Sequence, residues 1–144
     1  MLDVKYVNNQ IMNSPIFEYE MKVRDYECDV QGHVNNANYQ HYFEVTRHEF
    51  LERQGLNFYE LHKQGVDAVV ARVDIRYKSP LYGSDEFKCT VCMERKKLTY
   101  LFHQEIIRLS DQKLCAVGAI EVACLIKGKL SQPVIFDEAF AEYI

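Results

Sequence analysis

A carboxylate and an imidazole lie four residues apart in this chain, on either side of a glycine and just before a helical pattern. They are Asp29 and His33, with Gly32 between them. Asp29 is thereby placed in a loop that leads into a helix N-terminus. Unpaired backbone N–H groups and the positive end of the helix dipole can hold a developing negative charge there. A carboxylate beside such a pocket can attack a carbonyl, or activate water against it. The spacing therefore predicts a site for acyl transfer or hydrolysis.

The elements that must position this loop can be read from hydrophobic periodicity. Residues 16–26 alternate between apolar and charged side chains, which predicts a half-buried strand. Residues 36–54 then follow a three- and four-residue period, which predicts a long helix. Asn35 or Asn36 is its expected N-cap, and Gly55 its expected C′ residue. A short second helix or turn is expected over residues 58–64.

Four strand-like runs follow the helices, at residues 69–77, 87–94, 100–109 and 114–126. The last run is apolar on both faces, so it is expected to be central in a sheet or covered by another subunit. Residues 132–144 are expected to form an irregular tail. The order of elements predicts an α+β protein in which one antiparallel, five-stranded sheet wraps a long central helix. We expect a single domain over residues 1–144, with its core at about residues 16–130.

Composition narrows the function classes. The chain has 144 residues and a net charge of −4, and its only basic run is Arg95-Lys96-Lys97, so a general nucleic-acid binder is disfavoured. No apolar run reaches the roughly 18 residues that a membrane helix needs. Residues 1–14 lack the apolar core of a secretory signal. These features predict a cytoplasmic protein without a membrane span.

The five cysteines are odd in number and scattered, which fits a reducing compartment better than a disulfide framework. Cys89 and Cys92 form a C-x-x-C pair within a predicted strand. Alternation along the strand would point the two thiols to opposite faces, and a second ligand pair is missing. We therefore expect no metal.

An ordered set of residues resembles a known family. The pattern Asp29-x-x-Gly32-His33-x-Asn35-Asn36-x-x-Tyr39-x-x-x-Phe43-Glu44-x-x-Arg47 is similar to the signature of hotdog-fold acyl-CoA thioesterases of the 4-hydroxybenzoyl-CoA thioesterase-like group. The Tyr77-x-Ser79-Pro80 corner, followed by Gly83-x-Asp85, matches as well. The resemblance covers roughly residues 16–130.

The resemblance implies a hotdog fold that works as a homodimer, often assembled into a homotetramer, with its site at the subunit interface. It implies hydrolysis of an acyl-CoA to a free acid and coenzyme A, with no cofactor besides the coenzyme A of the substrate. Asp29 matches the catalytic carboxylate as nucleophile or general base, and residues 36–39 match the donors that face the carbonyl. Many relatives carry a small or apolar residue at the position of His33 and a histidine at that of Asn36.

On this basis the expected site has three groups of residues. The catalytic group is Asp29, His33 and Asn36. The substrate-binding group is Gly32, Asn38, Tyr39 and Phe43, although Tyr39 and Phe43 also fit the core of the helix. The group for the phosphates of coenzyme A is Arg95, Lys96 and Lys97, with Arg72, Arg76 and Lys78 as other candidates.

Several alternatives stay open. Glu44 could be a catalytic carboxylate on the central helix, but a structural ion pair with Arg47 is favoured, because a buried carboxylate without a partner is costly. A hotdog hydratase or dehydratase would pair His33 with Glu44 or Asp29. The thioester could be carried by acyl carrier protein rather than coenzyme A, and a non-catalytic acyl-binding module is a further possibility. The acyl group is not specified by the sequence.

Overall fold

The computed structural model describes residues 14–144. Residues 1–13, which make up most of the segment expected to lack a secretory signal, lie outside the described residues. The elements, in chain order, are β1 (Phe17–Lys22), the 3-10 helix η1 (Asp25–Glu27), α2 (Asn36–Arg53), α3 (Phe58–Lys63), β2 (Val66–Tyr77), β3 (Glu86–Arg95), β4 (Thr99–Arg108), β5 (Lys113–Ile126), β6 (Lys129–Leu130) and α4 (Val134–Ala139).

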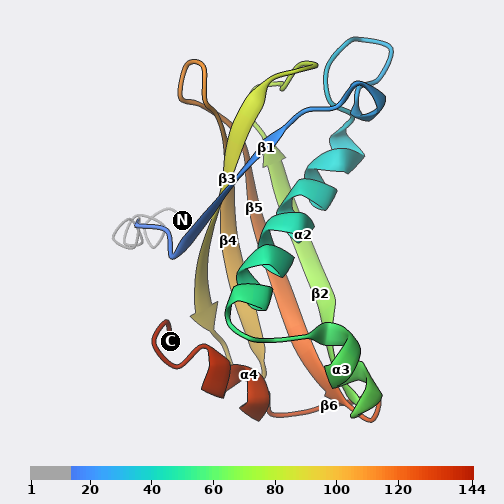
Figure 1. Cartoon of the computed structure of the whole chain (residues 1–144), viewed down its shortest axis with the longest axis vertical. Coiled ribbons are helices and arrows are strands. Elements are labelled where there is room, and N and C mark those ends of the chain that lie inside the picture. The colour runs from blue at the N-terminus through green and yellow to red at the C-terminus, as the bar shows by residue number, and fades with distance from the viewer. Residues whose placement is uncertain (1–13) are drawn as a thin grey trace.

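The strands form one antiparallel sheet in the order β1-β3-β4-β5-β2, with β6 paired to the end of β5. Figure 1 shows α2 lying along one face of this curved sheet. The predicted α+β architecture, a single sheet wrapped around a long helix, is confirmed. The prediction that residues 114–126 form a central strand is also confirmed, because β5 lies between β4 and β2.

The central helix begins and ends where capping chemistry predicts. The side chain of Asn35 accepts a hydrogen bond from the N–H of Ala37, so Asn35 is the N-cap, and Gly55 takes the positive φ of 84° that a C′ residue needs. Its buried residues recur at three- and four-residue steps: Tyr39, Tyr42, Phe43, Thr46, Arg47, Phe50 and Leu51.

The helix packs closely against the sheet at Gly118 of β5. A Cβ atom built there would lie 2.9 Å from Cε2 of Phe43, closer than such atoms approach in proteins. The missing side chain therefore lets Phe43 become fully buried.

Two expectations about the strands and the tail are corrected. The expected irregular tail contains α4, because Phe136 and Phe140 are buried in the cluster that includes Phe50 and Tyr100. The sheet has a sixth, two-residue strand, β6, because the turn at residues 127–128 folds the chain back onto β5.

The expected ion pair between Glu44 and Arg47 is wrong. Within residues 14–144, Glu44 is exposed and lies 3.8 Å from His48, whereas the buried Arg47 donates a hydrogen bond to Gln104 at 3.1 Å. Arg47 is therefore buried beside Gln104, and Glu44 is exposed at the surface of the helix. No helix in the described part of the chain is long and apolar enough to cross a membrane.

Candidate active site

The Asp29 loop is a tight turn held by its own backbone. The N–H of Gly32 donates to the carbonyl of Asp29, and the N–H of Asp29 donates to the carbonyl of His33, both at 3.0 Å. Gly32 adopts a φ of 86°, a conformation that glycine takes without steric cost. One carboxylate oxygen of Asp29 accepts the N–H of Gln31 at 2.9 Å. The Asp29 side chain is thereby oriented by the loop itself.

Two isolated β-bridges hold this loop, one within it and one to a neighbouring segment. Cys28 pairs with Val34 across the base of the loop, and His33 pairs with Tyr82. The N–H of Val34 also donates to the carbonyl of Leu81 at 2.8 Å. The loop is therefore continuous with the segment of residues 79–82 that follows β2.

The start of α2 supplies a free backbone donor beside the loop. The N–H of Ala37 is taken by the side chain of Asn35, and the N–H of Asn38 by the carbonyl of Asn35. Within residues 14–144, the N–H of Asn36 has no hydrogen-bond acceptor in the protein. This donor lies at the positive end of an 18-residue helix, which is where a developing oxyanion is stabilised.

Asp29 and Asn36 line the same open cavity, whose volume is about 420 Å³. Its wall is completed by Gln31, His33, Val34, Tyr39, Tyr77, Lys78, Ser79 and Pro80. The cavity thus combines a carboxylate, an imidazole, a helix N-terminus and one cation. We call it the Asp29 cavity.

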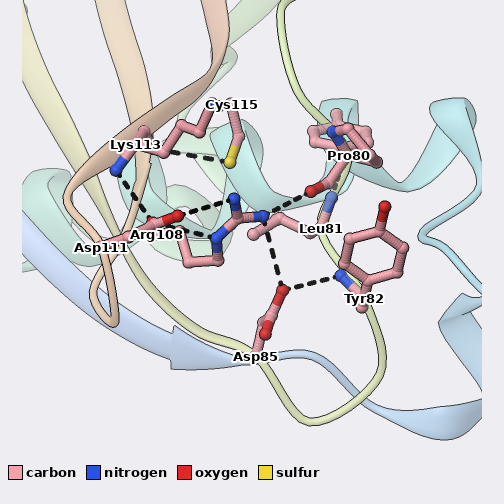
Figure 2. A network of polar contacts seen from close by, with 9 residues as sticks. Pro80, Leu81, Tyr82, Asp85, Arg108, Asp111, Lys113 and Cys115 are labelled. Carbon is pink, nitrogen blue, oxygen red and sulfur yellow. Dashed lines mark hydrogen bonds and ion pairs between the residues drawn. The ribbon is translucent and has the colours of Figure 1, made fainter.

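The far wall of this cavity is fixed by Arg108 at the end of β4 (Figure 2). Its guanidinium donates to the carbonyl of Pro80 at 2.7 Å and forms a bidentate pair with Asp111 at 3.0 Å. It also lies 3.8 Å from Asp85, whose carboxylate accepts the N–H of Tyr82 at 2.8 Å. Arg108 therefore joins the β4–β5 turn to the segment of residues 79–82.

Comparison with known proteins now decides the family. The family model described as "Thioesterase-like superfamily" matches residues 23–144. The chain belongs to this superfamily.

Relatives and solved structures agree with the assignment. The chain is 36% identical over 107 residues to long-chain acyl-CoA thioesterase FadM of Escherichia coli, covering 74% of this chain and 80% of FadM. It is 43% identical over 74 residues to acyl-acyl carrier protein thioesterase ATL3 of Arabidopsis thaliana, covering 51% of this chain and 39% of ATL3. The chain therefore spans only about two fifths of the length of that relative. A 1,4-dihydroxy-2-naphthoyl-CoA thioesterase from Synechocystis shares the fold, with a TM-score of 0.82 at 16% identity, covering 88% of this chain and 96% of the other.

Within this thioesterase-like chain, the structure brings four of the expected site residues together. Asp29, His33, Asn36 and Tyr39 all line the Asp29 cavity. Tyr39 is almost fully buried, and burial raises the pKa of its hydroxyl.

Three expected substrate-binding residues lie outside the cavity lining. Gly32 shapes the turn. The side chain of Asn38 donates to the carbonyl of Glu27 at 2.8 Å, so it anchors the start of the helix. Phe43 is fully buried against Gly118. Their contacts are structural, and their assignment to substrate binding stays a prediction.

Four residues after and at the end of β2 line the cavity but are not in the expected substrate-binding group, although the sequence drew attention to each of them. Tyr77, Ser79 and Pro80 are part of the corner matched to the family, and Lys78 was only one of several basic candidates. The turn after β2 brings these residues to the start of α2, where the hydroxyl of Tyr77 donates to the carbonyl of Asn36 at 3.1 Å.

The predicted phosphate-binding run lies far from the Asp29 cavity of the same protomer. Through the strand pairs Arg95–Tyr100, Tyr100–Val122 and Val122–Val70, Arg95 is level with Val70 of β2. Tyr77 is seven residues further along, or about 23 Å at 3.3 Å per residue. Figure 1 shows the β3–β4 turn and the Asp29 loop at opposite ends of the sheet.

Arg95 also has a structural role. Its guanidinium pairs with Asp137 of α4, with Nε 2.8 Å from Oδ1. Lys96 and Lys97 follow Arg95 in the turn between β3 and β4. The binding of the phosphates of coenzyme A by these residues stays a prediction.

The five cysteines are in the thiol form in the structure, and Cys89 is buried whereas Cys92 is half-buried. Burial raises the pKa of Cys89 to about 12. Among residues 14–144, no group of three or more His, Cys, Asp or Glu side chains is arranged to hold a metal ion.

Proposed function

We propose that this protein hydrolyses an acyl-CoA thioester to a free carboxylic acid and coenzyme A, with Asp29 as its catalytic carboxylate. The observation that carries the proposal is the placement of the Asp29 carboxylate and the unpaired N–H of Asn36 on one cavity. Membership of the thioesterase-like superfamily and the similarity to FadM support the reaction class.

The chemistry follows from this placement. The thioester carbonyl oxygen accepts a hydrogen bond from the N–H of Asn36, where the helix dipole stabilises the negative charge of the tetrahedral intermediate. Asp29 takes a proton from the attacking water, or attacks the carbonyl carbon itself and is then released by water. The carbon–sulfur bond breaks, the thiolate of coenzyme A leaves and takes up a proton, and the acid remains. His33 lies on the same cavity as a polar group for the thioester.

The phosphates of coenzyme A need a cation near the mouth of the cavity. Lys78 lines the cavity, and we assign it this role ahead of Lys96 and Lys97 in the same protomer. The acyl group itself is left to experiment.

We also propose that two copies pair through the free edge of β2. Among residues 14–144, no strand pairs with the outer edge of β2, and Val69, Val70 and Tyr77 on it are exposed. An uncovered strand edge of this length is a template for pairing with another chain. Pairing into a homodimer would place each Asp29 cavity near the partner subunit. We further propose that such dimers assemble into a homotetramer. A cytoplasmic location remains part of the proposal.

The test is thiol release from a panel of aliphatic and aromatic acyl-CoAs and from acyl carrier protein thioesters. Asp29→Asn keeps the size of the side chain and removes its basicity, so we expect kcat to fall by about 10²- to 10⁴-fold. Asp25→Asn is the matched control, because Asp25 lies in η1 on the surface and does not line the cavity.

Each outcome has a defined meaning. Turnover that collapses only in Asp29→Asn supports the proposal, and near-normal turnover in a folded Asp29→Asn protein would remove Asp29 from the mechanism. Release of thiol only from carrier protein thioesters would move the substrate toward the class named for ATL3. A change of acyl-chain absorbance without thiol release would indicate a hydratase or dehydratase, and binding without any reaction would indicate an acyl-binding module.

A further inference from the structure

A second cavity, of about 410 Å³, lies under the C-terminal half of α2. Apolar side chains dominate its wall, among them Leu51, Phe58, Ala68, Val70, Phe102, Val122, Phe136 and Phe140. It has no lining residue in common with the Asp29 cavity. We call it the Arg47 cavity, after the cation in its wall.

Arg47 is an unusual group for such a position, because its side chain is 95% buried. Its only hydrogen bond to the described residues runs from Nη1 to Oε1 of Gln104, which leaves the other guanidinium donors without a protein acceptor. Gln104 is itself fully buried and uses its amide nitrogen on the carbonyl of Phe43. Burial lowers the pKa of Arg47, so the guanidinium carries an uncompensated cost of desolvation.

The two carboxylates on the wall do not neutralise this charge. Glu44 is half-exposed and lies beside His48, at 3.8 Å, and Asp67 lies 2.7 Å from His62. Neither is within ion-pair distance of Arg47 among residues 14–144. The charge of Glu44 raises the pKa of Arg47, but less than burial lowers it.

We propose that the Arg47 cavity binds a monocarboxylate with an apolar tail, that is, a free fatty acid. The carboxylate pairs with the free donors of Arg47, a geometry for which guanidinium is suited. The tail lies against the apolar wall formed by α2, α3, β2 and α4. The volume is within the range of small-molecule sites.

This site is separate from the proposed catalytic one. Arg47 is eleven residues along α2 from Asn36, or about 16 Å at 1.5 Å per residue. The buried side chains of Tyr39 and Phe43 lie between them on the helix. The inference does not rest on thioester hydrolysis, and it stands or falls on binding alone.

Calorimetric titration of the 144-residue protein with octanoate tests the proposal, with octan-1-ol as the uncharged probe. Arg47→Met removes the charge and keeps an apolar side chain of similar length, and such exchanges of buried charge are often neutral or stabilising. We expect octanoate to bind the wild type and to bind Arg47→Met at least tenfold more weakly. Octan-1-ol should bind both within about twofold.

A second pair of variants covers the case in which Arg47→Met does not fold. Ala68→Phe fills the cavity and keeps Arg47, so we expect it to lose both probes. Ala119→Phe is the matched control, because Ala119 also lies on a strand but does not line the cavity. Asp29→Asn should bind octanoate like the wild type.

A carbon-13 label on the octanoate carboxyl gives a readout that packing alone would not change. Pairing with Arg47 should hold the carboxyl ionised to lower pH in the bound state than in free octanoate. The proposal is overturned if the wild type does not bind octanoate, if Arg47→Met or Ala68→Phe binds it as tightly as the wild type, or if Asp29→Asn abolishes binding.

Discussion

The hydroxyl of Tyr39 accepts a hydrogen bond from the backbone N–H of Leu81 at 3.1 Å, which ties the central helix to the wall of the Asp29 cavity. Both residues are buried, and Leu81 is fully so. The same segment is joined to the Asp29 loop through the carbonyl of Leu81 and the N–H of Val34. One residue, Leu81, thus connects the helix start, the Asp29 loop and the corner after β2.

Tyr39→Phe should therefore destabilise the protein. The change leaves the buried N–H of Leu81 without an acceptor, which costs about 1–3 kcal/mol. Urea unfolding followed by circular dichroism measures the change. Tyr77→Phe is the control, since the exposed hydroxyl of Tyr77 loses a hydrogen bond that water can replace. Equal effects of the two changes would contradict the role given to Tyr39.

Arg108→Lys should loosen the far wall of the Asp29 cavity. A lysine cannot reproduce the fork that holds Asp111 while donating to the carbonyl of Pro80. We expect a loss of about 2 kcal/mol in unfolding free energy and a several-fold rise in KM with a smaller change in kcat.

The matched control for Arg108 is Arg53→Lys, because Arg53 is exposed and lies 3.6 Å from Glu49 on the surface. Steady-state kinetics and unfolding of both variants decide the point. An Arg108→Lys enzyme with wild-type KM and stability would show that the Pro80 wall needs no such anchor.

Gly118→Ala should be destabilising although alanine is the smallest possible addition. The new methyl group would lie 2.9 Å from Phe43, so the helix or the β5 strand must shift, at a cost of about 1–3 kcal/mol. Gly83→Ala serves for comparison, because its Cβ would meet only the thiol of Cys28, at 3.9 Å. Thermal unfolding with no difference between the two variants would mean that the core accommodates the methyl group.

The docking of α4 should weaken in acid. Hydrogen bonds from Arg95 and from the hydroxyl of Tyr100 hold the pKa of Asp137 below its usual range. Because the folded-state pKa lies below the unfolded value of about 3.9, this stabilisation is complete above about pH 5 and is lost as the pH falls through the folded-state pKa.

The unfolding free energies of wild type and Asp137→Asn should therefore differ by a constant amount above about pH 5 and converge as the pH falls through the folded-state pKa of Asp137. Glu142→Gln, an exposed change near the same terminus, should show no such convergence. A gap between wild type and Asp137→Asn that is constant with pH would assign the effect to packing rather than to the charge.

Periodicity predicted the sheet and the central helix well, because strands and helices that bury one face carry period-two and period-3.6 patterns. It missed α4, which is six residues long and follows Pro133. Phe136 and Phe140, four residues apart, were the available signal, but so short a helix exists only through its tertiary contacts.

The site was predictable in part. Asp29, His33 and Asn36 are close in sequence, so a local motif brought them together. Lys78 lines the cavity and directly follows the last residue of β2. Arg47 is buried, although a charged residue at its place in the helical pattern predicts an exposed side chain. Both placements depend on how the sheet curves around the helix, and spacing along the chain does not contain that information.

The pairings that join the Asp29 loop to its neighbours have a kinetic consequence. Cys28 with Val34, and His33 with Tyr82, leave the loop already ordered before any ligand arrives. A preformed loop loses little conformational entropy on binding. Substrate association should then be a single diffusional step without a slow closing phase, and turnover should be governed by bond chemistry or by departure of the products rather than by motion of a lid.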